Sequence, residues 1–181
     1  TLFRSPDMDA IKAVASEPIA MVDAAKRKEV EDLVYKLKSD GDSTGGIVEV
    51  FATGLPVGIG NPNFDGIENR LARTVFGVPA IKGVSFGSGF DGCSSLGSLQ
   101  NDAFTMDGDV VKTTTNNSGG IQGGITNGMP LVMQVGIKPT ASIYTEQNSV
   151  SLSAKEPTKL VIKGRHDPCV ALRAVSIIEA R

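Results

Sequence analysis

The 181-residue chain has no tryptophan, one histidine and two cysteines. Cys93 and Cys169 lie far apart, with no CxxC spacing and no pattern of neighbouring Cys or His ligands. This scarcity argues against a zinc site and against a disulfide framework, so we expect no metal and a reducing, cytoplasmic compartment. No apolar run approaches the roughly 20 residues that cross a bilayer, and the first residues lack a basic-then-apolar signal segment. We therefore expect no membrane partner.

An excess of positive charge is also missing. The 18 Lys and Arg residues are scattered and are balanced by 20 Asp and Glu residues, for a net charge of −2. A nucleic-acid partner is therefore not expected. The apolar share of 40% and the charged share of 21% are ordinary for a globular protein, and the length suffices for one domain with a core.

The first regular elements should be a long helix and a strand. Ser16 and Pro18 form a start signal, and the helix should run towards Lys38. Its apolar side chains recur at i, i+3, i+4 and i+7 and should face the core: Val30, Leu33, Val34 and Leu37. The β-branched alternation of residues 46–52 then predicts a strand.

The remaining elements alternate between helices and strands. Asp65 should cap a second helix, which Pro79 ends, and residues 87–100 should be loop. Further strands are predicted at 84–86, 131–137 and 160–162, with a short helix beginning at Pro168. Short polar turns between strands favour an α+β fold with an antiparallel sheet and helices packed on it.

Several glycine-rich and polar blocks follow one another along the chain. Three lie towards its end: Gly119–Gly128, Lys138–Ser142 and Gly164–Cys169. Four others precede them: Asp42–Gly46, Gly54–Gly60, Ala80–Gly83 and Gly87–Phe90. Taken in order, the blocks resemble chorismate synthase, an FMN-dependent family of the shikimate pathway of aromatic amino acid biosynthesis.

The resemblance covers nearly the whole chain but only part of the family sequence. The family's N-terminal half, with its GESHG and RSSAR motifs, has no counterpart in residues 1–181, and the family's C-terminal apolar helix continues beyond Arg181. We therefore expect residues 1–181 to be a single fragment, the C-terminal half truncated at both ends, and to be inactive alone. The implied fold is about half of a sandwich of antiparallel sheets and helices.

The turn at Gly123–Gly128 precedes a strand, so it fits neither a Walker A loop nor a dinucleotide-binding fingerprint, which both need a helix N-terminus. Glycine pairs of this kind are more often tight turns than ligand cradles. The resemblance implies that flavin lies against the bare backbone of Gly123.

The Lys138–Ser142 block ends a predicted strand with a cation, a rigid turn and two hydroxyls, which suits a phosphate or the polar edge of a flavin. The alternative is a simple turn with a solvated lysine. The resemblance implies FMN contacts for the whole block: Lys138, Pro139, Thr140, Ala141 and Ser142. It also implies a contact at Pro79 and Ala80, where Pro79 replaces the family's usual Asn and can offer only its carbonyl and ring.

The Arg165–Asp167 triplet combines a permanent cation, a group that titrates near neutral pH and a carboxylate. At the end of a strand, Arg165 and Asp167 should share one face and His166 should lie on the other. A lone histidine is more often structural than catalytic. The resemblance implies that Arg165 binds the flavin phosphate or substrate, that Asp167 is an acid near flavin N5, and that His166 belongs to the catalytic segment.

The activity implied by the resemblance is an anti 1,4-elimination of phosphate from 5-enolpyruvylshikimate 3-phosphate, which gives chorismate and requires reduced FMN. NADPH is the reductant in bifunctional members, and the family forms homotetramers. Two other hypotheses remain open. The chain could be a non-catalytic, self-associating module that binds flavin or phosphate, or a plain sugar-phosphate or nucleotide binder that uses Lys138 and Arg165.

Overall fold

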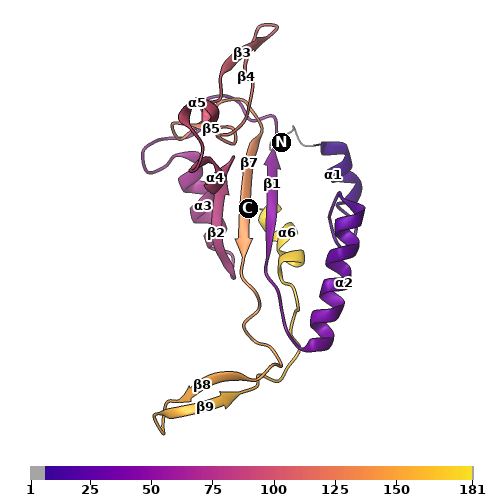
Figure 1. Cartoon of the computed structure of the whole chain (residues 1–181). Coiled ribbons are helices and arrows are strands. Elements are labelled where there is room, and N and C mark those ends of the chain that lie inside the picture. Colours follow the sequence, from indigo (N-terminus) through magenta and orange to yellow (C-terminus); the bar gives the residue numbers. More distant parts are fainter. Residues whose placement is uncertain (1–6, 181) are drawn as a thin grey trace.

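The centre of the fold is a three-stranded antiparallel sheet, in a computed structural model that describes residues 7–180. The strand order is β1 (Gly46–Ala52), β7 (Leu131–Ile137) and β2 (Ile81–Phe86), with β7 in the middle (Figure 1). The predicted strands 46–52 and 131–137 are confirmed at both ends. The predicted strand 84–86 is the second half of the longer β2.

One face of this sheet carries the core. Val135 of β7 is completely buried, and Met133 and Ile137 point to the same side because side chains alternate along a strand. Helices α3 (Ile67–Phe76) and α6 (Ala171–Glu179) cover this face next to β2 and β1 respectively (Figure 1). Their buried side chains complete the cluster: Val75, Ala171, Ala174 and Ile178.

The opposite face of the sheet is largely open. Ile47 is 72% exposed, and the side-chain amide of Gln134 donates a 3.3 Å hydrogen bond to the Glu49 carboxylate across the β1–β7 pair. This face is mixed in character, because the apolar Val132 is buried on it while Ile47 is exposed. The α+β fold class predicted from the sequence is confirmed.

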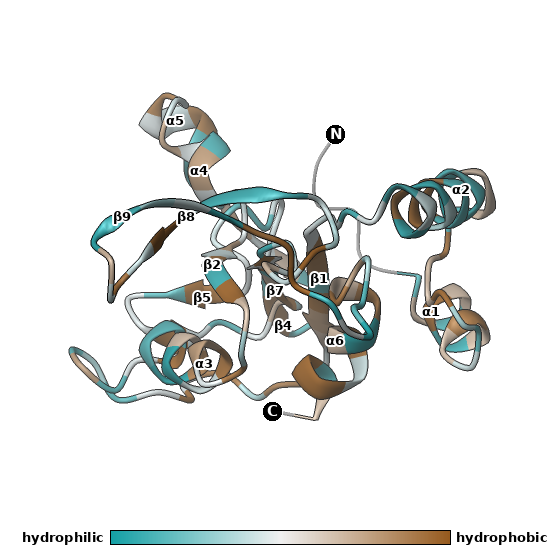
Figure 2. Cartoon of the chain, turned by 90° about the horizontal axis from the view of Figure 1, so that it is seen from below, coloured by the Kyte–Doolittle hydropathy of each residue, from teal (hydrophilic) through white to brown (hydrophobic). Residues whose placement is uncertain are grey.

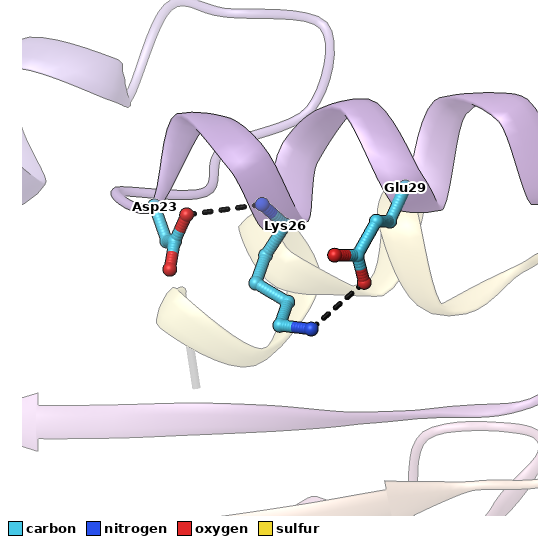
Figure 3. A network of polar contacts seen from close by, with 3 residues as sticks. All are labelled: Asp23, Lys26 and Glu29. Carbon is cyan, nitrogen blue, oxygen red and sulfur yellow. Dashed lines mark hydrogen bonds and ion pairs between the residues drawn. The ribbon is translucent and has the colours of Figure 1, made fainter.

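The N-terminal part forms two helices instead of the single one predicted. Helix α1 (Met8–Val14) was not predicted, and α2 (Ala24–Asp40) begins well after Ser16 and Pro18. The reason is that the carboxylate of Asp23 accepts a 3.0 Å hydrogen bond from the backbone N–H of Lys26 and so caps α2 at this position (Figure 3). The predicted start at Ser16 was wrong. The predicted loop at Phe3–Asp7 lies mostly outside the described residues.

The apolar stripe of α2 is only partly buried. Val34 packs against the core cluster, whereas Leu33 is 45% exposed. In Figures 1 and 2, α2 stands at the side of the sheet, beyond β1, instead of lying flat on it. The expectation that this stripe would form the core therefore holds for Val34 and is wrong for Leu33.

The other helix boundaries follow the sequence more closely. Helix α3 ends at Phe76, ahead of Pro79, but its N-cap is Gly66 and no side chain caps it, so Asp65 is not the cap. The segment predicted as loop contains two four-residue helices, α4 (Gly89–Gly92) and α5 (Gly97–Gln100). Helix α6 begins three residues after Pro168.

Three two-stranded hairpins extend from the central sheet. They are β3–β4 (Phe104–Asp107 with Val110–Thr113), β5–β6 (Ile121–Gln122 with Ile125–Thr126) and β8–β9 (Gln147–Ser151 with Glu156–Leu160). Hairpins β3–β4 and β8–β9 project from opposite ends of the molecule (Figure 1). The predicted strand 160–162 overlaps β9 only at Leu160, so that prediction was largely wrong. Among residues 7–180, no helix has the length and apolar character to cross a membrane.

Candidate functional site

Three segments that are distant in the sequence meet at the C-terminal end of β7. The hydroxyl of Ser43 donates a 2.6 Å hydrogen bond to the carbonyl oxygen of Thr140. The backbone N–H of the next residue, Thr44, donates a 2.8 Å hydrogen bond to the carbonyl oxygen of Pro168. The turn between α2 and β1 therefore touches both the 138–142 block and the segment that follows Arg165.

Close backbone approach at this junction depends on Gly45. A Cβ at this position would lie 2.3 Å from the carbonyl oxygen of Ile137 and 3.2 Å from Cδ of Pro139. Real Cβ atoms do not tolerate the first of these distances, so a larger residue would push the chain away from the end of β7. The glycine lets the Asp42–Gly46 turn lie directly against the start of the 138–142 block.

The predicted pair Pro79 and Ala80 joins the same junction from the other side. The backbone N–H of Lys138 donates a 2.9 Å hydrogen bond to the carbonyl oxygen of Ala80. Ala80 has φ of 72°, a left-handed conformation that few residues other than glycine adopt. Strain of this kind is found preferentially at functional sites, which makes this position a candidate contact.

A cleft of about 220 Å³ opens beside the junction. It lies between the end of α2, the Asp42–Ser43 turn and the two segments that flank β8–β9. The side chains of the predicted triplet line it together with residues of the opposite wall: Leu37, Lys38, Asp42, Ser43, Ile143, Tyr144, Arg165, His166, Asp167 and Pro168. The cleft thus brings together the triplet and Ser43. Lys138 and Thr140 do not line it, and Thr140 is joined to it through the Ser43 hydrogen bond.

The triplet does not sit at the end of a strand, because β9 ends at Leu160 and residues 161–168 are irregular. The predicted strand alternation of Arg165 and Asp167 therefore does not apply. His166 is half-buried, with its Nε2 atom 3.0 Å from the carbonyl oxygen of Ile162 and its ring 5.0 Å from that of Tyr144 in an edge-on arrangement. Since a carbonyl only accepts, Nε2 must carry the proton. These contacts favour a structural role.

Asp167 is also engaged within the chain. One carboxylate oxygen accepts a 3.1 Å hydrogen bond from the backbone N–H of Cys169, and the other lies 3.2 Å from Nε of Arg173 on α6. The Arg173 side chain is largely exposed, so this ion pair is worth little to stability. Asp167 still lines the cleft, and its charge is therefore available to a ligand there.

The two cations named by the sequence have no carboxylate partner within the described part of the chain. Neither Lys138 nor Arg165 forms an ion pair there, and Lys138 Nζ contacts only the carbonyl oxygen of Pro139 at 3.4 Å. Lys38, at the end of α2, lines the cleft and likewise forms no ion pair with residues 7–180. Cations beside hydroxyls and turn backbone are the donor set that binds phosphate.

Gly123 is not part of this junction. It forms the β5–β6 turn with Gly124, and both have positive φ, as a two-residue type I′ turn requires. This hairpin lies near the N-terminal end of β7, because the N–H of Val132 donates to the carbonyl oxygen of Gly119 at 3.0 Å. Seven residues of strand, roughly 20 Å, separate it from Lys138. The Gly123 backbone is exposed, with open space where a Cβ would lie.

A buried polar network that was not predicted from the sequence holds the segment that precedes β5. The carboxylate of Asp102 accepts hydrogen bonds from the hydroxyl of Thr115 (2.7 Å) and from the backbone N–H groups of Asn117 (2.7 Å) and Ser118 (2.8 Å). Burial would raise the pKa of Asp102, but these hydrogen bonds outweigh it and lower the pKa below the ordinary value of 3.8.

Asn116 extends this network to the strand. Its side chain donates to the carbonyl oxygen of Pro130 at 2.7 Å and accepts from the N–H of Gly120 at 2.8 Å. The signal in the sequence was a run of threonines and asparagines directly before the glycines, which are residues that bond to nearby backbone. Ser43 belongs to the Asp42–Gly46 block, but its spacing in the sequence does not indicate that it bonds to Thr140.

Comparisons with known proteins give the same family over nearly the full chain. The family model described as chorismate synthase matches residues 6–181. A chorismate synthase of Dehalococcoides mccartyi (strain BAV1) is 45% identical over 92% of this chain and 46% of its own length. One of Synechococcus sp. (strain RCC307) is 48% identical over 97% of this chain and 49% of its own length. The chain spans about half the length of these relatives.

A solved structure gives the same result for the fold. The crystal structure titled chorismate synthase superposes with a TM-score of 0.64 at 36% identity, over 68% of this chain and 38% of the other. These relatives carry the name of an enzyme.

Proposed function

This chain belongs to the chorismate synthase family, and we propose on that basis that it supplies part of a site that binds reduced FMN and 5-enolpyruvylshikimate 3-phosphate. The proposed reaction is the anti 1,4-elimination of phosphate that yields chorismate. We propose residues 1–181 as the C-terminal half of such an enzyme. The observation that carries the proposal is the meeting of three family blocks at the end of β7, with Lys138 and Arg165 unpaired among the described residues.

The residues at this junction fit a flavin phosphate and a phosphorylated substrate. Lys138 and Arg165 offer positive charge, and Thr140 and Ser142 offer hydroxyl donors in a turn that Pro139 stiffens. Pro79 and Ala80 adjoin this turn through the Lys138 N–H bond and would hold the flavin edge by backbone contact. Ala141 is exposed beside them and would pack against the ring.

The cleft-lining residues would act on the reacting part of the site. Reduced FMN, if bound there, would supply electron density to the substrate as its phosphate departs. Arg165 would neutralise the phosphate charge that develops as the C–O bond breaks. Asp167 would set the charge near flavin N5, and His166 would keep the irregular segment in place through Ile162 and Tyr144. Gly123 would contact flavin only at a surface distant from this junction, and its role stays a prediction.

Flavin titration and an activity assay test this proposal. The protein expressed from its complete coding sequence should bind reduced FMN and form chorismate under anaerobic conditions, measured by chorismate absorbance. A protein that binds inorganic phosphate or nucleotide equally well with oxidised, reduced or no flavin would support the plain phosphate binder instead. Location in the cytoplasm, assembly as a homotetramer and NADPH as a reductant remain predictions from the family, which gel filtration and a coupled NADPH assay would test.

A further inference from the structure

Ser43 makes a short, long-range hydrogen bond beside the proposed flavin site. Its hydroxyl donates to the carbonyl oxygen of Thr140 at 2.6 Å, although 97 positions separate the two residues. Among the described residues, this is the one side-chain hydrogen bond that joins the 41–46 turn to the 138–142 block. The other links of this turn lead elsewhere. The Thr44 N–H donates to the Pro168 carbonyl oxygen at 2.8 Å, and longer side-chain contacts run from Thr145 to the Gly41 carbonyl oxygen (3.5 Å) and from Cys169 Sγ to the Gly45 carbonyl oxygen (3.9 Å).

The partner of Ser43 determines what the contact controls. The 138–142 block is irregular, so no strand or helix ladder fixes its peptide groups. Holding the Thr140 carbonyl oxygen fixes the plane of the peptide that joins Thr140 to Ala141, and with it the direction in which Ser142 leaves the turn. A short hydrogen bond in a half-buried position is well placed to hold this orientation.

Ser43 also links the two parts of the proposed site. It lines the cleft that contains Arg165 and Asp167, while its hydroxyl bonds the block that contains Lys138. Gly45, two residues later, lets the same turn lie against Ile137 and Pro139. The Ser43 side chain therefore connects the cleft to the cation-bearing turn, alongside the backbone contacts of Thr44 and the close approach at Gly45.

We propose that Ser43 is a positioning residue for the flavin site, which it serves by fixing the Thr140 carbonyl and not by binding the cofactor itself. The inference rests on the proposed function. Losing the bond would let the 138–142 block sample several conformations, and only a fraction of the molecules would then be competent to bind. Affinity falls by that fraction.

The test compares four variants, Ser43→Ala, Ser43→Thr, Thr44→Val and Lys138→Ala, in the protein expressed from its complete coding sequence, with Ser43→Cys in reserve. Each is titrated with FMN and melted without it. Ser43→Ala should raise the FMN dissociation constant roughly three- to tenfold, the range expected for one net hydrogen bond. Ser43→Thr keeps the hydroxyl and should retain affinity. Thr44→Val is the matched control, because within the described part of the chain the one hydrogen bond of the Thr44 hydroxyl goes to the neighbouring Gly45 carbonyl at 3.3 Å. Ser43→Cys, with a weak donor of similar shape, replaces the alanine variant if that variant does not fold.

The outcomes separate this inference from the proposed function. Weaker FMN binding in Ser43→Ala at an unchanged melting temperature, restored in Ser43→Thr, supports the positioning role. Wild-type affinity in Ser43→Ala, with reduced affinity in the fourth variant, Lys138→Ala, overturns the inference and leaves the flavin site standing. Wild-type affinity in both overturns the flavin site and the inference together.

Discussion

The backbone N–H of Lys138 donates to the carbonyl oxygen of Ala80 at 2.9 Å, which joins the end of the central strand to the start of an edge strand. Ala80 holds a left-handed backbone at the point of contact. The two positions named from separate sequence blocks as flavin contacts therefore form one unit. A change in the backbone conformation at one of them should therefore shift the backbone of the other.

Substitutions at Ala80 should show the cost of this backbone conformation. Ala80→Val places a β-branched side chain at positive φ and should lower the free energy of unfolding by roughly 1–3 kcal/mol. Ala80→Gly, which tolerates positive φ, should be close to neutral or slightly stabilising. Urea denaturation of both variants measures the difference. Equal stability of the valine and glycine variants would show that this conformation carries no strain.

Removing either unpaired cation should weaken flavin binding. Lys138→Ala and Arg165→Ala should each lower the binding free energy for FMN by roughly 1–3 kcal/mol, the loss expected for a charge-assisted hydrogen bond. Lys155→Ala is the matched control, since Lys155 lies in the turn of the β8–β9 hairpin, away from the junction. Fluorescence titration gives the three affinities. An unchanged affinity in both site variants would refute the assignment of these cations.

Asp167 should be needed for turnover more than for folding. Asp167→Asn keeps an oxygen for the N–H of Cys169 and loses only the ion pair with the exposed Arg173. We expect turnover to fall roughly 10²-fold or more, as for groups that act on the reacting atoms, with little change in melting temperature. Arg173→Ala removes the same ion pair and should leave turnover unchanged. Early melting of Asp167→Asn at a normal rate would instead assign Asp167 a structural role.

Asp102 should contribute stability that depends on pH. Its folded pKa is lowered, because hydrogen bonds from Thr115, Ser118 and Asn117 outweigh desolvation, so protonation disfavours the folded state. The contribution is complete above the unfolded pKa of about 3.8 and is lost as pH falls through the lower folded pKa.

Asp102→Asn places an amide N–H₂ against donors and should cost roughly 1–3 kcal/mol near neutral pH. The gap between the two proteins should narrow below pH 3.8 in urea denaturation. A gap that stays constant with pH would show that the carboxylate charge is not responsible.

The parts of the fold that the sequence predicted are those with a strong apolar pattern. In β1 the side chains alternate between the two faces of the sheet, and in β7 most side chains are apolar and buried. The bounds of both strands were predicted correctly. β8 is polar and half-exposed, with no apolar face to reveal it, and it was missed. The start of α2 was misplaced because Pro18 is a helix-start signal, yet the nearby Asp23 caps the helix through its carboxylate.

The sequence predicted individual residues of the site but not which of them lie close together. The turn at Lys138 follows directly from the end of a clear strand, so its position was correct. Whether Gly123 lies near Lys138 depends on which strand is central and in which direction it runs, and neither can be read from spacing. The contact between Ser43 and Thr140 could not be predicted for the same reason. The two residues are 97 positions apart, and the folding of the sheet brings them together without a local sequence pattern.

The strand order also has a consequence for how the chain folds during synthesis. β1 and β2 never pair with each other, and both pair only with β7, which is the last of the three to be made. At usual translation rates, several seconds pass between the emergence of β1 and that of β7. During that interval the backbone groups of β1 lack their strand partner and its apolar side chains lack the core that β7 completes, so the central sheet forms only after residue 137 has been made.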